Sequence, residues 1–151
     1  MITFEVEAVS TAAPHEVWAL LGDVRTWATW TAFDASELEA PADDAAEPNG
    51  VGAIRRFRRG RRTTRETVVV FEPDAHLAYV LLSGVRAQDY RADVTLTPTA
   101  GGGTRILWRS SFRAEMPGTG WLTKVFVRHF VRQVARDLAA AAAKPRVSLA
   151  T

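Results

Sequence analysis

Residues 14–30, PHEVWALLGDVRTWATW, decide the fold. Pro14 suits the first position of a helix, because proline has no amide hydrogen to leave unpaired there. The apolar residues that follow predict a short amphipathic helix ending near Gly22, with one face made of Val17, Trp18, Leu20 and Leu21. A second short helix should carry Trp27 and Trp30. Since such an aromatic segment suits a lid better than a regular core, we expect Trp27 and Trp30 to close one end of a cavity.

The chain has 151 residues, 47% of them apolar, which suffices for one domain with a substantial core. We expect this domain to span residues 1–143, with a frayed tail over 144–151. The lack of cysteine excludes disulfides, thiolate metal sites and thiol nucleophiles. The first residues alternate like a strand, and no apolar run approaches the roughly 18 residues of a membrane span, so we expect a soluble, cytoplasmic protein. The net charge of +2 is too small to indicate nucleic-acid binding by itself.

Seven segments show the patterns that predict strands: 2–10, 33–39, 51–59, 62–71, 76–83, 86–97 and 104–114. A terminal helix is predicted over 118–143. The links between the last five strands are short, so these strands should run antiparallel. A turn at Gly60-Arg61 would place Arg55 opposite Glu66, and a turn at Gly84-Val85 would place Tyr79 opposite Tyr90.

The inward side of the predicted sheet is mixed in character. Its apolar area comes from Phe57, Leu77, Leu81, Val94, Ile106, Trp108 and Phe112, and its hydrogen-bonding groups from Arg55, Glu66, Tyr79, Gln88, Tyr90 and Ser110. Because burying an unpaired charge is costly, Arg55 and Glu66 should be paired, hydrated or both. On the terminal helix the stripe expected to face the sheet is Leu122, Phe126, Phe130, Val134 and Leu138, and the stripe expected to face away is Lys124, Arg128, Arg132 and Arg136.

Five stretches occur in a characteristic order: AAPHEVWALLGDVRTWATW, VGAIRRF, RETVVVFEP, HLAYVLLSG and LTPTAGGGTRILW, followed by the closing helix. In this order, over residues 2–143, the chain resembles the START-like superfamily, also called SRPBCC, and most closely its bacterial polyketide cyclase/dehydrase and lipid-transport family. The resemblance implies an α+β helix-grip fold. In that fold a strongly curved, seven-stranded antiparallel sheet wraps around a long C-terminal helix, and two short helices lie between the first two strands. It also implies a cavity for an apolar or amphipathic small molecule.

Members of this family include carriers and aromatase/cyclases, so the fold leaves the function open. We expect binding of a hydrophobic small molecule, lipid or polyketide-like, without a cofactor or a metal. The expected ligand-binding residues are Trp30, Phe57, Leu77, Tyr79, Leu81, Tyr90, Val94, Ile106, Trp108, Ser110, Phe112, Phe126 and Phe130.

The alternative is a polyketide cyclase or dehydratase that acts on a ligand in the same cavity. Its candidate catalytic groups are Glu66, Arg55, Tyr79 and Tyr90, with His129 at the edge of the helix. A cross-strand ion pair that only neutralises itself is the simpler explanation for Arg55 and Glu66, and aromatic packing with hydroxyls that reach water is the simpler one for the tyrosines.

Arginines crowd residues 55–65, RRFRRGRRTTR, which we name the basic hairpin. This segment suggests contact with nucleic acid, an anionic membrane surface or an acidic partner. However, acidic residues precede it at Asp34, Glu37 and Glu39, and aromatic residues hardly interleave with its arginines. A solvated hairpin is the simpler explanation, so we expect neither nucleic-acid nor membrane contact from it. The sequence leaves open whether the protein is a monomer or a homodimer.

Overall fold

The computed structural model describes residues 1–145. Strand β1 (Ile2–Ser10) leads into helix α1 (Pro14–Leu21), the 3₁₀ turn η1 (Val24–Thr26) and helix α2 (Trp27–Trp30). Six strands come next: β2 (Ala35–Ala40), β3 (Ile54–Arg59), β4 (Arg62–Glu72), β5 (His76–Ser83), β6 (Ala87–Pro98) and β7 (Thr104–Ala114). Helix α3 (Gly120–Ala143) closes the fold, and the predicted tail beyond Pro145 lies outside the described residues.

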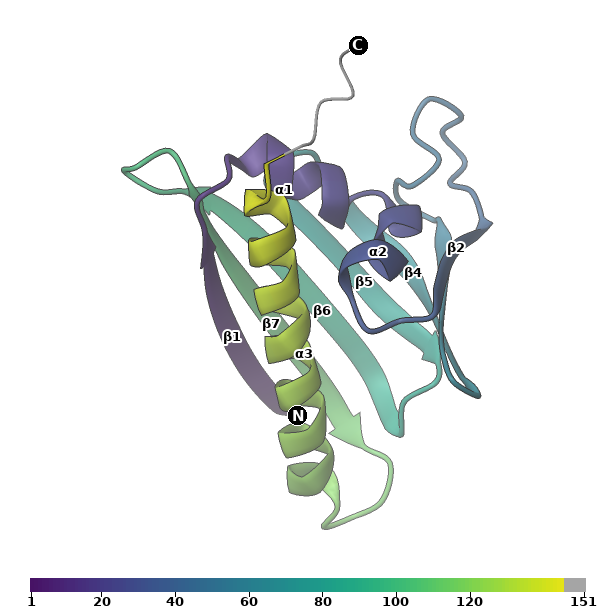
Figure 1. Ribbon diagram of the computed structural model, residues 1–151. Helices are drawn as coiled ribbons and strands as arrows, with labels where there is room; N and C mark the ends of the chain where they lie inside the picture. The colour runs from purple at the N-terminus through teal and green to yellow at the C-terminus, as the bar shows by residue number, and fades with distance from the viewer. Residues whose placement is uncertain (146–151) are drawn as a thin grey trace.

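The strands form one antiparallel sheet in the order β1-β7-β6-β5-β4-β3-β2, and this sheet curves around the helices (Figure 1). Helix α3 lies along β1 and β7 on the concave side, while α1 and α2 cover one end of the same side. The buried core lies between these helices and the sheet. The helix-grip arrangement implied by the resemblance is therefore confirmed.

The strand expected from residue 51 begins only at Ile54. Residues 50–53 form a turn instead, in which the Ala53 amide donates to the Gly50 carbonyl. The predicted register of the first hairpin is confirmed, because Arg59 pairs with Arg62 and Arg55 pairs with Glu66. The sequence therefore predicted the facing of this charged pair correctly.

The predicted register of the second hairpin is wrong by two residues. Tyr79 pairs with Ala92 rather than with Tyr90. The connection from β5 to β6 is longer than a two-residue turn, and the β6–β7 register shifts between Gln88 and Arg91, where Asp89 adopts a positive φ of 51°. A shift of two residues preserves the facing of a strand, so both tyrosines still point to the concave side, whereas Gln88 is exposed rather than inward.

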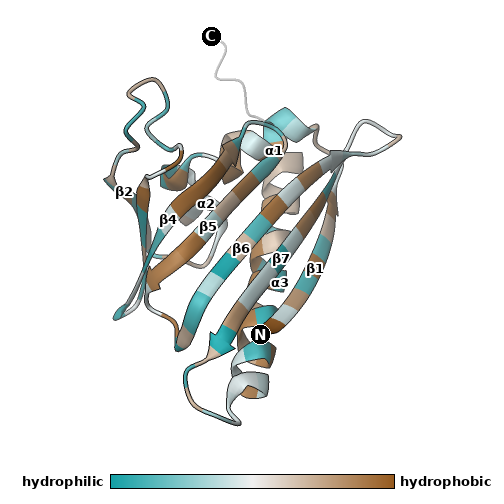
Figure 2. Ribbon diagram, turned by 180° about the vertical axis from the view of Figure 1, so that it is seen from behind, coloured by the Kyte–Doolittle hydropathy of each residue, from teal (hydrophilic) through white to brown (hydrophobic). Residues whose placement is uncertain are grey.

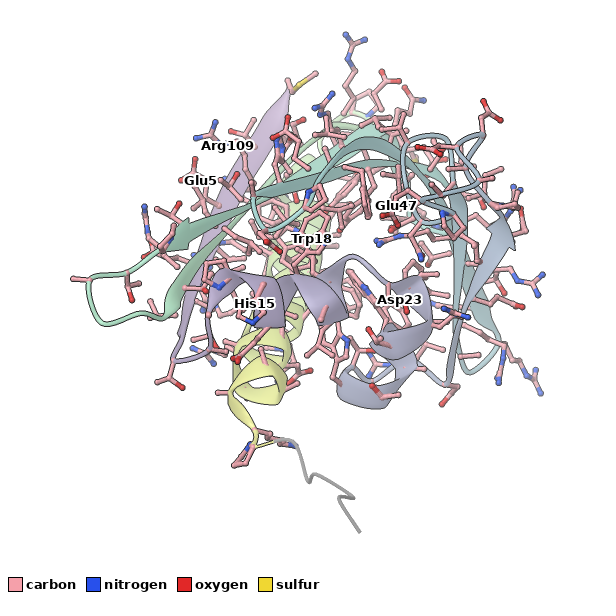
Figure 3. The ribbon with its side chains drawn as sticks, turned by 90° about the horizontal axis from the view of Figure 1, so that it is seen from above. Glu5, His15, Trp18, Asp23, Glu47 and Arg109 are labelled. Carbon is pink, nitrogen blue, oxygen red and sulfur yellow. The ribbon has the colours of Figure 1, made fainter. Side chains whose placement is uncertain are left out.

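The convex face of the sheet carries cross-strand ion pairs. Hydrophilic and hydrophobic residues alternate along its strands when it is seen from behind (Figure 2). Arg109 Nε donates to Glu5 Oε1 at 2.8 Å, and Figure 3 shows the two side chains together on the outer side of the sheet. A second pair joins Arg105 to Glu7 at 2.7 Å. These exposed pairs keep charge on the outside, so the concave face is the one that packs a core.

The face of helix α3 that packs on the sheet agrees with the predicted one at Val134 and Leu138 but differs from it at Leu122 and Phe126. Its buried residues are Gly120, Val127, Val131, Val134, Ala135, Leu138 and Ala139, whereas Leu122 and Phe126 are exposed and Lys124, Arg128 and Arg132 are half-buried. The reason is geometric: steps of four residues advance by about 40° around a helix with 3.6 residues per turn. The stripe from Leu122 therefore starts on the outside and reaches the core only near Val134. Small residues on the buried face let α3 lie close to β1.

Within residues 1–145, no helix has both the length and the apolar character needed to cross a membrane.

Candidate functional site

Aromatic side chains meet in the concave interior, between α2 and the strands β3 and β7. The Trp27 ring lies 4.8 Å from the Trp30 ring, 5.2 Å from the Phe57 ring and 6.1 Å from the Trp108 ring, measured between centroids. All four side chains are buried. We name these four residues the aromatic cluster, and it joins α2 to β3 and β7.

Helix α2 is held in place by polar contacts around Trp27. The Trp27 indole N–H donates to the Leu21 carbonyl at 3.0 Å, and the amide of Ala28 donates to Ser36 Oγ at 2.9 Å. The indole N–H of Trp30 donates to Thr26 Oγ1 at 3.1 Å. Both indole N–H groups are thus satisfied by acceptors within the segment from α1 to α2, and the ring surfaces pack against the other aromatic residues.

Trp18 plays a different part. It lies between α1 and the sheet, where Figure 3 labels it, and it packs edge-on against Phe71 at 5.0 Å. This contact fastens α1 to β4, outside the aromatic cluster.

Arg55 and Glu66 form a buried ion pair next to the aromatic cluster. Arg55 Nε donates to Glu66 Oε1 at 2.7 Å, and Arg55 Nη2 donates to the same oxygen. Their side chains are only 1% and 5% exposed. The guanidinium carbon also lies 4.7 Å from the ring centroid of Trp27 and 5.3 Å from that of Tyr79, where the negative faces of the rings attract it.

Two buried hydrogen-bond donors in this interior lack an acceptor. Arg55 Nη1 and Trp108 Nε1 are buried and have no hydrogen-bond partner within the described residues. A buried donor left unpaired costs about 1–3 kcal/mol, so native proteins usually provide it with an acceptor or a water. An oxygen atom from outside the chain, brought close to these two donors, would supply the acceptor that they lack.

The two tyrosines complete the polar groups of the interior. The Tyr90 hydroxyl donates to Ser110 Oγ at 3.0 Å, and burial raises the pKa of Tyr90 to about 12. Burial, aided by the charge of Glu66, holds the pKa of Tyr79 well above its usual value. The nearby Trp108 indole N–H acts in the opposite direction and lowers the pKa of Tyr79. The two groups do not meet the geometry of a hydrogen bond.

Burial also raises the pKa of the Glu66 carboxyl, and the charge of Arg55 and its hydrogen bond oppose that rise. A carboxyl in such surroundings can exchange a proton closer to neutral pH than an exposed one.

Most of the residues predicted for the ligand site lie together in this interior. Those that are buried are Trp30, Phe57, Leu77, Tyr79, Tyr90, Val94, Ile106, Trp108, Ser110 and Phe112, and those that are half-buried are Leu81 and Phe130. Phe130 reaches the edge of the cluster through Phe33, with 5.7 Å between ring centroids. Phe126 is exposed, so the prediction that it faces the sheet is wrong. His129 is also exposed.

The sequence placed Trp27 only at one end of a cavity, whereas it occupies the centre of the interior. Its spacing of three residues from Trp30 puts both rings on the same side of a short helix, which is the one signal that could have indicated this role.

Two clefts open outside the aromatic cluster. One, of about 410 Å³, is lined by Leu20, Thr29, Trp30, Thr31, Asp137, Ala140, Ala141 and Lys144. The other, of about 430 Å³, lies between β1 and α3. The Arg55–Glu66 pair lines neither cleft, and the rings of the cluster fill the space beside it. Only the first cleft touches the cluster, at Trp30.

The described residues contain no group of three or more acidic or histidine side chains placed to hold a metal ion. Half-buried His76 lies on β5, where its Nε2 is 2.8 Å from Asp93 Oδ1. This contact is a local pair on the sheet.

A family model described as polyketide cyclase / dehydrase and lipid transport matches residues 1–145. No curated protein matches the chain.

Solved structures share the fold at low sequence identity. A START superfamily protein from Mycobacterium smegmatis has a TM-score of 0.78 and is 12% identical, over 93% of this chain and 96% of that protein. The solution NMR structure of a protein from Thermobifida fusca has a TM-score of 0.76 and 23% identity, over 94% and 93% of the two chains. The protein Ara h 8.0201 has a TM-score of 0.74 and 12% identity, over 93% and 97%. These similarities show a common architecture.

Proposed function

This chain belongs to the polyketide cyclase/dehydrase and lipid transport family, and we propose that it binds a hydrophobic or amphipathic small molecule in its concave interior. Family and fold suggest ligand binding in a hydrophobic cavity. The finer part of the proposal is that the ligand is a lipid or a polyketide-like compound and that the protein acts in the cytoplasm.

The observation that carries the proposal is the pair of buried donors without acceptors. Arg55 Nη1 and Trp108 Nε1 belong to side chains that both lie against the Trp27 ring. A ligand with an apolar body and one carbonyl, hydroxyl or carboxylate oxygen would supply the missing acceptor. Its apolar body would take the place of contacts that the Trp27 ring now makes with its neighbours. The proposed ligand site consists of the predicted residues without Phe126, and with Trp27 added.

Ligand entry requires α2 to move, because Trp27 occupies the middle of the interior. Helix α2 has only four residues, and the first cleft gives access to its Trp30 edge. Outward rotation of this short segment would open a path from the cleft to Arg55. Lids of this kind commonly move on the microsecond to millisecond timescale.

Native mass spectrometry of the protein purified from its own cells tests the proposal directly. A co-purified small molecule that the intact protein retains, and that denaturation releases, is the expected result. Protein that carries no molecule, and that also fails to bind fatty acids and aromatic ketones in titrations, would contradict it.

A matched pair of ligands tests the role of the Trp108 N–H. The compounds 2-acetylnaphthalene and 2-ethylnaphthalene have similar shape, but only the first has a carbonyl acceptor. Trp108→Phe keeps an aromatic ring and removes the donor, so it should weaken binding of the acetyl compound by about two- to tenfold and leave the ethyl compound nearly unchanged. Equal losses for both ligands would mean that Trp108 contributes only packing. Arg105→Ala on the convex face serves as the control.

The raised pKa of Glu66 favours a second candidate function, that of a cyclase or dehydratase. Glu66 would act as acid or base, and Arg55 or Tyr79 would stabilise an enolate oxygen. Mass spectrometry of a polyketide-like ligand before and after incubation separates the two functions. Dehydration appears as loss of water, cyclisation appears as a changed retention time, and an unchanged compound supports binding alone.

A further inference from the structure

The first two turns of α3 expose four large apolar side chains to solvent. They are Trp121, Leu122, Val125 and Phe126, with exposed fractions of 59–68%, and Met116 in the preceding loop is exposed as well. We name these five residues the helix tip. Scattered exposed apolar residues are normal, but a contiguous group that includes a tryptophan and a phenylalanine marks a contact surface.

The helix tip and the basic hairpin lie at the same end of the molecule. Because neighbouring strands are antiparallel, the β3–β4 turn, the β5–β6 link and the link from β7 to α3 all occur at one end of the sheet. Figure 1 shows this end opposite α1. The apolar helix tip and the turn that carries Arg59 and Arg61 therefore project from the same end of the molecule, with the β5–β6 link between them.

The arginines at this end are largely free of acidic partners. Elsewhere in the basic hairpin, Arg56 pairs with Glu37, Arg58 with Asp34 and Arg65 with Glu39. At the tip of the hairpin, Arg59, Arg61 and Arg62 are exposed and form no ion pair within residues 1–145, and the same holds for Arg86 in the β5–β6 link. The Asp34 carboxylate reaches the turn, where it accepts from the Gly60 amide at 2.6 Å, but it forms no ion pair with Arg59, Arg61 or Arg62.

Basic residues continue along α3, where Arg136 is exposed and Lys124, Arg128 and Arg132 are half-buried. From Gly120 to Arg136 the helix contains no aspartate or glutamate, and its basic residues are Lys124, Arg128, Arg132 and Arg136. An apolar end followed by a basic stretch is the composition of helices that insert shallowly into a membrane interface, where lysine and arginine contact the headgroups.

We propose that this end of the protein docks on an anionic lipid bilayer. The helix tip enters the interface, with Trp121 and Phe126 at headgroup level, and the arginines of the hairpin turn contact lipid phosphates. Considered alone, the basic hairpin predicted no membrane contact because aromatic residues are nearly absent from it. Helix α3 provides those aromatic residues from 60 positions further along the chain, since Trp121 follows Arg61 by that distance.

Charge argues against a second copy of the chain as the occupant. A twofold contact through this end would place its unpaired arginines against themselves. The exposed acidic residues at this end are Asp34, Asp89 and Glu115, and the first two already pair with Arg58 and Arg113, so a second copy offers few free carboxylates to these arginines. A bilayer that contains anionic lipid offers both the apolar layer and the negative charge that this surface lacks.

Co-sedimentation with vesicles tests the proposal without any ligand present. The protein should bind vesicles of phosphatidylcholine mixed with phosphatidylglycerol, bind pure phosphatidylcholine vesicles at least about tenfold more weakly, and lose binding as salt rises. Trp121 is the most exposed tryptophan, so its emission should shift to shorter wavelength and be quenched by brominated lipid. Failure to bind anionic vesicles overturns this inference and leaves the proposed ligand binding intact.

Two double variants test the apolar helix tip and the arginines of the hairpin turn separately. Trp121→Ser with Phe126→Ser, and Arg59→Glu with Arg61→Glu, should each lower vesicle partitioning at least about tenfold, because roughly 1 kcal/mol is expected per basic residue near an anionic surface. Val51→Ser and Arg25→Glu alter an exposed apolar and an exposed basic residue outside this end, and they should change nothing. Partitioning that is unaffected by the first two variants overturns the proposal. So does sedimentation equilibrium showing a dimer that the helix-tip variant dissociates.

Discussion

Trp27 of α2 and Trp108 of β7 meet in the concave interior, with their ring centroids 6.1 Å apart and their planes at 74°. This edge-on contact joins a four-residue helix to β7, the second strand in the order of the sheet. The contact explains why the interior is occupied in the structure, and it is the reason why the ligand entry that we propose requires α2 to move.

Removing the Trp27 ring should cost the protein stability. Trp27→Ala deletes a buried side chain that contacts three other aromatic residues, so the free energy of unfolding should fall by about 3–5 kcal/mol. Urea denaturation measures the change. Trp121→Ala is the matched control, because this tryptophan is exposed and its loss should change stability by no more than about 0.5 kcal/mol. Similar losses for both variants would contradict the assigned packing.

Removing one partner of the buried ion pair should destabilise the fold more than replacing both partners with apolar residues. Glu66→Leu leaves the Arg55 guanidinium buried without its carboxylate, which should destabilise the fold by about 3–5 kcal/mol. The double variant Arg55→Met with Glu66→Leu removes both charges and should recover most of that loss. Thermal and urea unfolding of the two variants provide the comparison. If the double variant is no more stable than Glu66→Leu, the ion pair contributes more to stability than the neutralisation of two buried charges.

The two tyrosines should resist ionisation in the folded protein. Their folded pKa values are raised by burial above the usual value near 10, to about 12 for Tyr90. Below pH 10 both hydroxyls are protonated in both states. As pH rises from 10 towards 12, the unfolded chain loses its protons first, so stability should fall in that range. Since the chain has only these two tyrosines, ultraviolet titration reports on them alone. Phenolate absorbance near pH 10 in folded protein would contradict their burial.

Gly84 in the β5–β6 link should not tolerate a side chain. Its φ is +108°, and a Cβ placed there would lie 2.6 Å from the Thr63 carbonyl oxygen of β4. Gly84→Ala should therefore destabilise the protein by more than about 1 kcal/mol, through both backbone strain and overlap. Gly52→Ala isolates the strain, because Gly52 has a φ of +91° and open space around it. Equal effects in chemical denaturation would indicate that the overlap is relieved by local movement.

Local patterns in the sequence predicted the elements, the antiparallel run of the last five strands and the facing of Arg55 opposite Glu66. Strand alternation has a period of two, and a two-residue turn fixes the pairing on both sides of it, so the basic hairpin could be aligned from residues 55–66 alone. The same rule failed at Tyr79, because the bulge near Asp89 and the longer link after Ser83 leave no clear mark in the sequence.

The tertiary structure alone decided three features of the candidate site. It placed Trp27 at the centre of the interior, left Arg55 Nη1 and Trp108 Nε1 without acceptors, and turned Phe126 away from the sheet. Each of these depends on how far one element rotates or approaches another, and packing between distant segments sets that position. Sequence periodicity defines which residues share a face of a helix, but the partner that the face meets is chosen only when the whole chain is folded.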